Sequence, residues 1–194
     1  MTGHPIEHIR QFARLTAEDE RRLESIMVER SFRKGETIRG AINFSSYAYY
    51  IKSGSTRVFY TFKGKEHTVD FIFDGEFVLI PRIVLQKCSD TVAIEFLETT
   101  RVLFVPHLQV KDILEGLGVV NDHDALLFLN ATLMHYTRNM EERLHVMQNF
   151  DSREKLAWVT ERYPRLLECA TISQVASFLG VTKETLYRIR SGKY

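Results

Sequence analysis

The sequence predicts an α+β fold in three parts: an N-terminal antiparallel β-roll, jelly-roll-like and flanked by helices, then a long helix, then a small helical domain. Residues 31–105 contain short β-branched and aromatic runs, separated by turn signals at intervals of roughly ten residues. Residues 121–147 carry apolar residues at steps of three and four, which is the spacing of a helix seam. The stretch SQVASFLGVTKETLYRIR, residues 173–190, indicates two short helices joined by a turn. The predicted domains are therefore residues 1–120, 121–149 and 150–194.

The composition is that of an ordinary globular protein. The chain has 194 residues, 44% of them hydrophobic, and no apolar run approaches the ~18 residues that suggest a membrane span. The N-terminal stretch MTGHPIEHIRQFARL is interrupted by charge and lacks the apolar centre of a signal peptide. Two cysteines, far apart in sequence, fit neither a disulfide scaffold nor a cysteine cluster for a metal. We therefore expect a cytoplasmic protein with no membrane partner and no metal.

The small net charge of +1 is unevenly distributed. From Asp151 onward the chain has eight Lys or Arg and five Asp or Glu, so this part carries +3 and the remainder carries −2. The basic excess is therefore C-terminal, although on its own it is too small to indicate a nucleic-acid partner.

The first part begins with a predicted helix over residues 16–30, TAEDERRLESIMVER, which Thr16 caps. The turn signals RKGE, KSGS, KGKE and DGE then separate the predicted strands. Residues 67–73 alternate between two sets of side chains, as in a strand with one buried face. The roll either only holds the chain together or encloses a ligand pocket, and spacing alone favours the first interpretation.

The second part is a long helix whose seam predicts a partner. A parallel homodimeric coil and a helix packed within its own chain are both compatible with this spacing. We expect the dimer, because little of the remaining chain could cover the whole seam. The expected dimer residues are Leu126, Leu129, Leu133, Tyr136, Met140 and Leu144.

The third part has the layout of a helix-turn-helix. Ser173 and Thr182 are good N-cap residues for two helices, and Gly180 between them suits a left-handed turn. The small Ala176 allows the two helices to approach closely. The polar residues that follow Thr182 then lie on the exposed side of the second helix, as in a recognition helix presented to the DNA major groove. The alternative is a helical hairpin whose charges are merely solvated.

The chain as a whole resembles the Crp/Fnr-type transcription regulators. The stretches KGETI (34–38), YIKSGSTRVFYTFKGKEHTV (50–69), DGEF (74–77) and the C-terminal stretch carry the likeness. The family's recognition helix commonly begins Ser/Thr-Arg/Lys-Glu-Thr and has an Arg four residues after the Glu, which matches residues 182–188 here. The resemblance implies a cyclic-nucleotide-binding-like sensor domain, a homodimer, an inverted-repeat operator in double-stranded DNA, and RNA polymerase as a further candidate partner.

The cyclic-nucleotide motif of that family is degenerate here. Ile80 falls where the family has a Glu that holds the ribose, and Ser89 and Asp90 lie in the region of its phosphate-binding Arg. Arg82 and Lys87 are substitutes that do not match the motif. Cyclic AMP binding is therefore not expected, no cofactor is identified, and another small-molecule effector is unknown. The candidate effector pocket comprises Phe77, Ile80, Arg82, Ser89, Asp90 and Tyr136.

Candidate DNA-binding residues follow from the helix-turn-helix. Lys183 and Arg188 suit guanine, Glu184 suits cytosine, and Arg190 and Lys193 suit phosphates. The full candidate set is Ser173, Gln174, Thr182, Lys183, Glu184, Thr185, Arg188, Arg190 and Lys193.

Two functions remain open at this point. The first is a dimeric, sequence-specific transcription regulator, and the alternative is a dimeric sensor or adaptor that binds proteins and no longer binds DNA. An enzyme is not expected, because the sequence has no Gly-rich phosphate loop, no metal motif and no nucleophile paired with a base.

Overall fold

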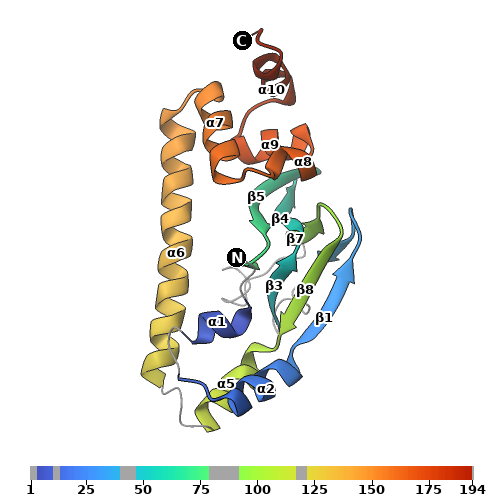
Figure 1. Cartoon of the computed structure of the whole chain (residues 1–194). Helices are drawn as coiled ribbons and strands as arrows, with labels where there is room; N and C mark the ends of the chain where they lie inside the picture. Colours follow the sequence, from blue (N-terminus) through green and yellow to red (C-terminus); the bar gives the residue numbers. More distant parts are fainter. Residues whose placement is uncertain (1–3, 11–13, 40–46, 79–91, 117–121, 194) are drawn as a thin grey trace.

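The computed structural model describes residues 4–10, 14–39, 47–78, 92–116 and 122–193. A β-roll occupies the centre, the long helix α6 runs along one side of it, and helices α7 to α10 cover one end (Figure 1). This arrangement confirms the predicted α+β class. Within the described residues no helix is both long and apolar enough to cross a membrane.

The β-roll consists of two four-stranded antiparallel sheets. One has the strand order β1-β8-β3-β6 and the other β2-β7-β4-β5. The strands are β1 (Val28–Phe32), β2 (Thr37–Arg39), β3 (Ala48–Ser53), β4 (Ser55–Phe62), β5 (Lys65–Phe73), β6 (Phe77–Val78), β7 (Val92–Phe96) and β8 (Thr100–Val105). Apolar side chains from both sheets meet between them and form the core, among them Ile51, Val58, Ile72, Ile94, Phe96 and Val102.

The turn between β3 and β4 requires glycine. Gly54 has a φ of 104°, and a Cβ atom there would lie 2.6 Å from Thr100 Oγ1 and 2.9 Å from Thr100 Cα. Because a side chain would collide with the adjacent backbone, this turn signal has a steric cause as well as a conformational one.

The N-terminal helix is shorter than predicted. Helix α2 (Ala17–Ile26) follows the shorter helix α1 (Pro5–Ile9), and Thr16 and Asp19 form a capping box at its start. The prediction that the helix extends to residue 30 is wrong, because β1 begins at Val28, which is opposite Phe104 in the ladder with β8. Pairing with a distant strand overrides the local helical pattern there.

Strand β5 does not show the predicted single buried face. Ile72 enters the core between the sheets, while Phe71 joins the cluster under the C-terminal helices, and both are nearly fully buried. Alternation is lost because the sheet is covered on both faces at this point.

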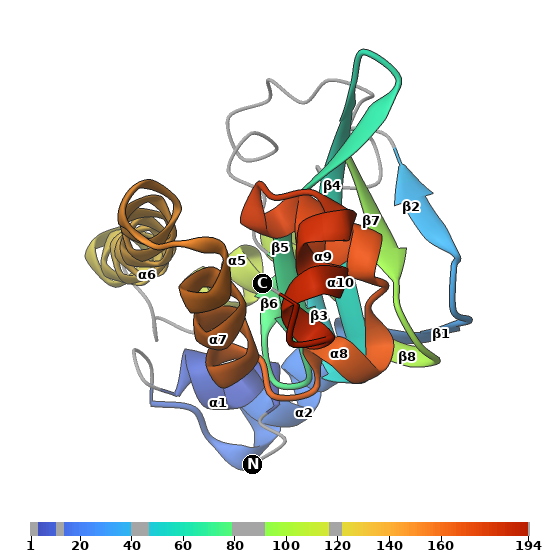
Figure 2. The same cartoon turned by 90° about the horizontal axis from the view of Figure 1, so that it is seen from above.

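The helical part begins with α5 (His107–Gly116) and α6 (Asp122–Asn149), followed by α7 (Ser152–Arg162), α8 (Leu166–Cys169), α9 (Ile172–Leu179) and α10 (Lys183–Arg190). Seen from above, α9 and α10 lie over the ends of β4 and β5 (Figure 2). Their core includes Phe71 and Leu97 of the β-roll together with Val159, Leu166, Val175, Phe178, Leu179 and Leu186. The C-terminal helices therefore pack on the outer face of the β2-β7-β4-β5 sheet, which contributes side chains to their core.

Candidate nucleic-acid interface

Helices α9 and α10 are two short helices joined by a tight turn, at the place where the sequence predicts a helix-turn-helix. Gly180 ends α9 with φ 64° and ψ 29°, a left-handed conformation, and the Val181 N–H donates to the Ala176 carbonyl at 3.1 Å. Ala176 is buried where the two helices approach. The roles predicted for Gly180 and Ala176 agree with this geometry.

The predicted start of α9 is wrong by two residues. Thr171, not Ser173, is the N-cap, because its hydroxyl accepts from the Gln174 N–H and the Gln174 side chain accepts from the Thr171 N–H at 2.8 Å. This reciprocal capping box is available only when Gln174 occupies the third helical position. Ser173 is consequently an exposed residue inside the first turn.

Helix α10 begins as predicted. Thr182 caps it, since its Oγ1 accepts from the Thr185 N–H at 3.1 Å. Leu186 is fully buried beneath the helix, and Val181 and Ile189 pack against the same cluster. These apolar contacts fix which side of α10 faces outward.

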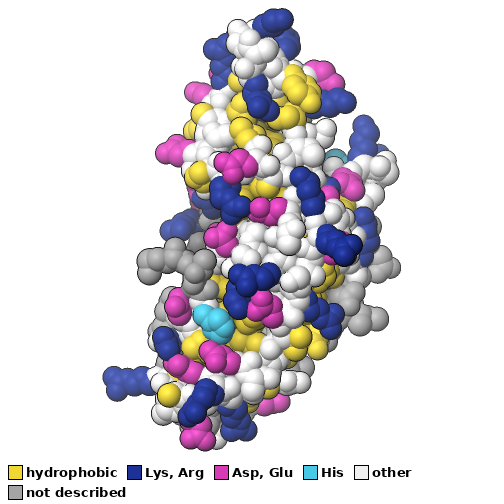
Figure 3. Space-filling view, turned by 45° about the vertical axis from the view of Figure 1, so that its right-hand side comes forward, with side chains coloured by type: hydrophobic (Ala, Val, Ile, Leu, Met, Phe, Trp, Pro, Cys, Tyr) yellow, Lys and Arg dark blue, Asp and Glu magenta, His cyan; other side chains and the backbone are white. Residues whose placement is uncertain are grey.

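The outward side of α10 is predominantly basic. Lys183, Glu184, Tyr187, Arg188 and Arg190 are exposed. Residues 182–193 contain four Lys or Arg and one Glu, a net charge of +3. Lys and Arg side chains gather at this end of the molecule (Figure 3). The arrangement favours an anionic partner of α10.

Helix α9 faces the β-roll. The Ser177 hydroxyl accepts from the Thr68 N–H at 3.0 Å and donates to the Glu66 carbonyl at 3.2 Å. Gln174 Nε2 donates to Glu95 Oε2 at 3.3 Å. The structure therefore brings Gln174 to the sheet, away from the exposed side of α10 where Lys183, Glu184 and Arg188 lie. Ser173 is exposed in the first turn of α9, and Thr185 is half-buried with its hydroxyl 2.9 Å from that of Thr182.

A buried arginine supports this contact between α9 and the sheet. Arg57 on β4 is 4% exposed and forms ion pairs with Glu66 and Glu95. It also donates to Thr68 Oγ1 at 3.1 Å and lies 4.3 Å from the centre of the Phe59 ring. Sequence reasoning missed Arg57, and the only available signal was a charged residue within an otherwise β-branched and aromatic strand.

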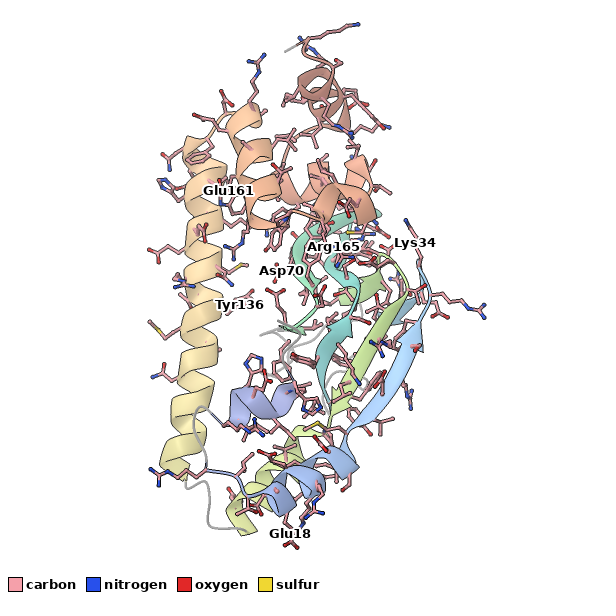
Figure 4. The ribbon with its side chains drawn as sticks, viewed as in Figure 1. Glu18, Lys34, Asp70, Tyr136, Glu161 and Arg165 are labelled. Carbon is pink, nitrogen blue, oxygen red and sulfur yellow. The ribbon has the colours of Figure 1, made fainter. Side chains whose placement is uncertain are left out.

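Two further arginines join the helices to the β-roll. Arg143 on α6 donates to the carbonyls of Val69 and Phe178, each at 2.8 Å. Arg165 beside α8 pairs with Asp74 at 3.0 Å and Glu98 at 2.9 Å, at the end of the β-roll seen in Figure 4. Arg143 thus connects α6, β5 and α9, and α9 is one of the two helices on which α10 packs.

The fold agrees with that of known proteins. Residues 29–116 match the family model of the cyclic nucleotide-binding domain, whereas no curated protein matches the chain. FixK2 from Bradyrhizobium japonicum is 22% identical with a TM-score of 0.67, over 86% of this chain and 84% of FixK2. A Crp/Fnr family regulator from Eubacterium rectale is 16% identical with a TM-score of 0.68, over 92% of this chain and 83% of that one. The chain has the Crp/Fnr fold. CLP from Xanthomonas campestris shares it at 14% identity and a TM-score of 0.63, over 91% of each chain.

On the long helix of this Crp/Fnr fold, the residues of the predicted seam differ in their exposure to water. Leu133 and Leu144 are 42% and 56% exposed, as is the neighbouring Met134 at 64%, whereas Tyr136 and Met140 are half-buried. The side chains of Leu126 and Leu129 lie outside the described part of the structure. One chain alone therefore leaves a stripe of large apolar side chains on α6 in contact with water.

The predicted effector residues are described only in part. Phe77 contacts the rings of His8 at 5.4 Å and Tyr50 at 5.0 Å, and Tyr136 lies on the side of α6 that faces the β-roll (Figure 4). Ile80, Arg82, Ser89 and Asp90 fall outside the described residues. The composition of the effector pocket therefore stays a prediction within this Crp/Fnr fold.

A partly buried carboxyl lies on β5 beside α6. The pKa of Asp70 is raised from 3.8 to about 6, mainly by burial and to a smaller extent by Glu76, while Arg143 and Arg162 oppose the shift. The Phe71 N–H donates to Asp70 Oδ1 at 2.9 Å, which favours the charged form without cancelling the effect of burial.

Replacing Asp70 with asparagine is expected to stabilise the protein at neutral pH. A raised pKa means that the folded state holds this proton more tightly than the unfolded state, so wild-type stability falls as the pH rises through the interval from 3.8 to about 6. The advantage of Asp70→Asn over wild type should therefore grow by roughly 1–2 kcal/mol across that interval. Urea unfolding of both proteins at several pH values measures it. An advantage that shrinks with pH would mean that the two arginines dominate.

Proposed function

We propose that this chain is a dimeric, sequence-specific DNA-binding transcription regulator of the Crp/Fnr type, with a β-roll that senses an effector. The observation that carries the proposal is the exposed basic side of α10, which the capped start at Thr182 and the buried Leu186 hold outward. A helix presented in this way fits the major groove, where arginine and lysine read guanine edges.

The candidate contacts divide by their place on α10. Lys183, Glu184 and Arg188 lie on the exposed side and are assigned to base edges. Thr182, at the helix start, and Arg190 and Lys193, at its end, are assigned to phosphates. Gln174 contributes only if its contact with Glu95 is released.

The exposed apolar stripe on α6 supports a homodimer. A parallel coil about α6 would cover Leu133 and Leu144 and place two copies of α10 on the same side of the assembly. Two recognition helices related by two-fold symmetry select an inverted repeat whose half-sites lie one DNA turn, about 34–36 Å, apart.

The double variant Leu133→Glu/Met140→Glu is expected to be monomeric. The substitutions place charges in the coil interface, where apolar packing cannot compensate for the lost hydration. Light scattering at micromolar concentration measures the change. Arg138→Glu, on an exposed position of the same helix, is the matched control and should remain dimeric. A monomeric wild-type protein would contradict the dimer.

Arg188→Ala is expected to weaken binding to the preferred duplex by about 1–3 kcal/mol and to relax the preference at one base pair. Lys193→Ala should weaken binding to all duplexes alike and lower the salt slope by about one. Fluorescence anisotropy, with duplexes selected from a random library, measures both effects, and Arg138→Ala is a basic-residue control away from α10.

The outcome also separates the two classes of function. If the dimeric wild-type protein shows no salt-dependent binding to any duplex, the DNA assignment fails and the protein-binding adaptor becomes the better interpretation. If it binds DNA but Arg188→Ala binds every site as wild type does, only the orientation assigned to α10 is wrong.

A further inference from the structure

Tyr187 is a large aromatic side chain in the middle of the exposed side of α10. Its relative exposure is 57%, whereas Leu186, the preceding residue, is fully buried and anchors the helix. Lys183 lies one turn earlier on the same side, and Arg188 follows directly. Among the described residues, no side-chain hydrogen bond, ion pair or ring contact involves Tyr187.

The position of Tyr187 therefore has no evident role in holding the fold. Apolar support for α10 comes from Val181, Leu186 and Ile189, on its opposite side. An aromatic ring in water gains free energy when a partner covers it, and tyrosine combines a large apolar surface with a polar tip. Exposed tyrosines flanked by charged residues are for this reason common anchors of binding interfaces.

The chemistry of the major groove limits what such a ring can recognise. The groove presents hydrogen-bond donors and acceptors at every base pair, and its apolar group is the C5-methyl of thymine. The aromatic ring of Tyr187 complements that methyl group, while the neighbouring Arg188 suits the acceptors of guanine. Tyr187 and Arg188 are both exposed and lie only about 1.5 Å apart along the helix axis, while their side chains leave the helix about 100° apart. This divergence assigns them to neighbouring base pairs, about 3.4 Å apart, and not to the same one.

We propose that Tyr187 is a specificity-determining residue that packs on the C5-methyl of a thymine beside the base pair read by Arg188. This inference rests on the proposed DNA-binding function and adds a thymine requirement within each half-site. It also predicts that the preference arises from the ring and not from the hydroxyl.

The test removes the methyl group from the DNA and the ring from the protein. The preferred duplex is first selected from a random library with the full-length wild-type dimer. Each thymine of one half-site is then replaced singly by deoxyuridine, which lacks only the methyl group. Affinities of wild type, Tyr187→Phe and Tyr187→Ala are measured by fluorescence anisotropy at one fixed salt concentration.

Wild type and Tyr187→Phe are expected to bind about four-fold more weakly at one deoxyuridine position, the effect of one buried methyl group. Tyr187→Ala should bind thymine and uracil equally at that position and keep the wild-type response elsewhere. Because Tyr187 is exposed, the variant should fold, which circular dichroism checks. Tyr187→Gln replaces it if it does not.

Unchanged thymine-to-uracil ratios in Tyr187→Ala would overturn this inference while leaving DNA binding in place. A wild-type protein indifferent to every thymine methyl group would do the same. The absence of any salt-dependent binding by wild type would instead overturn the proposed function, and the assignment of Tyr187 with it.

Discussion

Replacing Phe178 with alanine is expected to lower the free energy of unfolding by about 3–5 kcal/mol, because the substitution loses buried apolar surface and leaves a cavity. Phe178 is 2% exposed on α9. Its ring lies 5.2 Å from that of Phe71 on β5 and 6.2 Å from that of Trp158 on α7, and the Arg143 guanidinium lies 4.2 Å from its centre. The side chain therefore contacts three parts of the molecule at once.

Urea unfolding at one fixed protein concentration measures the loss, since the stability of the proposed dimer would depend on concentration. The matched control is Phe62→Ala, because Phe62 is 57% exposed at the tip of the β4–β5 hairpin. The control should change stability by no more than about 0.5 kcal/mol. Equal losses in the two variants would contradict the position of Phe178 at the junction.

Arg143→Met is expected to cost about 2–4 kcal/mol, because it leaves buried carbonyl groups without a donor. Strand β5 is at the edge of its sheet, and its register with β4 shifts between Val58 and Phe59, so that Val69 is an extra residue. Such a bulge leaves backbone groups unpaired, and Arg143 donates to the carbonyls of Val69 and Thr68, at 2.8 and 3.4 Å.

The same guanidinium also donates to the Phe178 carbonyl near the end of α9. Arg143→Lys should recover only part of the stability, because one ammonium group cannot reproduce the planar arrangement of donors. Arg138→Met, on an exposed position of α6, is the control for loss of charge and should behave like wild type. Thermal and urea unfolding both report the difference, and a stable Arg143→Met would show that water replaces the guanidinium.

Local features were predictable from the sequence because their causes are local. The sequence correctly predicts the turn at Gly180 and the cap at Thr182, since a left-handed turn and an N-cap involve residues only a few positions apart. The start of α9 was missed because Thr171 and Ser173 are both suitable caps, and only the reciprocal contact with Gln174 favours the first.

The arginine contacts that hold the C-terminal helices on the β-roll could not be predicted, because the residues that form each contact are distant in sequence. Arg57 and Glu95 are 38 residues apart, Arg143 and Val69 are 74 apart, and Arg165 and Asp74 are 91 apart. No periodicity connects such positions. For the same reason the residues after Ile26 were assigned to a helix, although pairing with β8 makes them a strand.

The C-terminal helices pack on one sheet of the β-roll, and this contact limits how the C-terminal domain could be exchanged between proteins. Phe71 and Leu97 belong to the β-roll by sequence but to the C-terminal core by packing, and Asp74 and Glu98 complete the ion pairs of Arg165. A recombinant that carried these helices onto another β-roll would need matching apolar and acidic residues on its strands. Under the proposed DNA-binding function, a new specificity would therefore be acquired more easily by substitutions along α10 than by transplanting the whole domain.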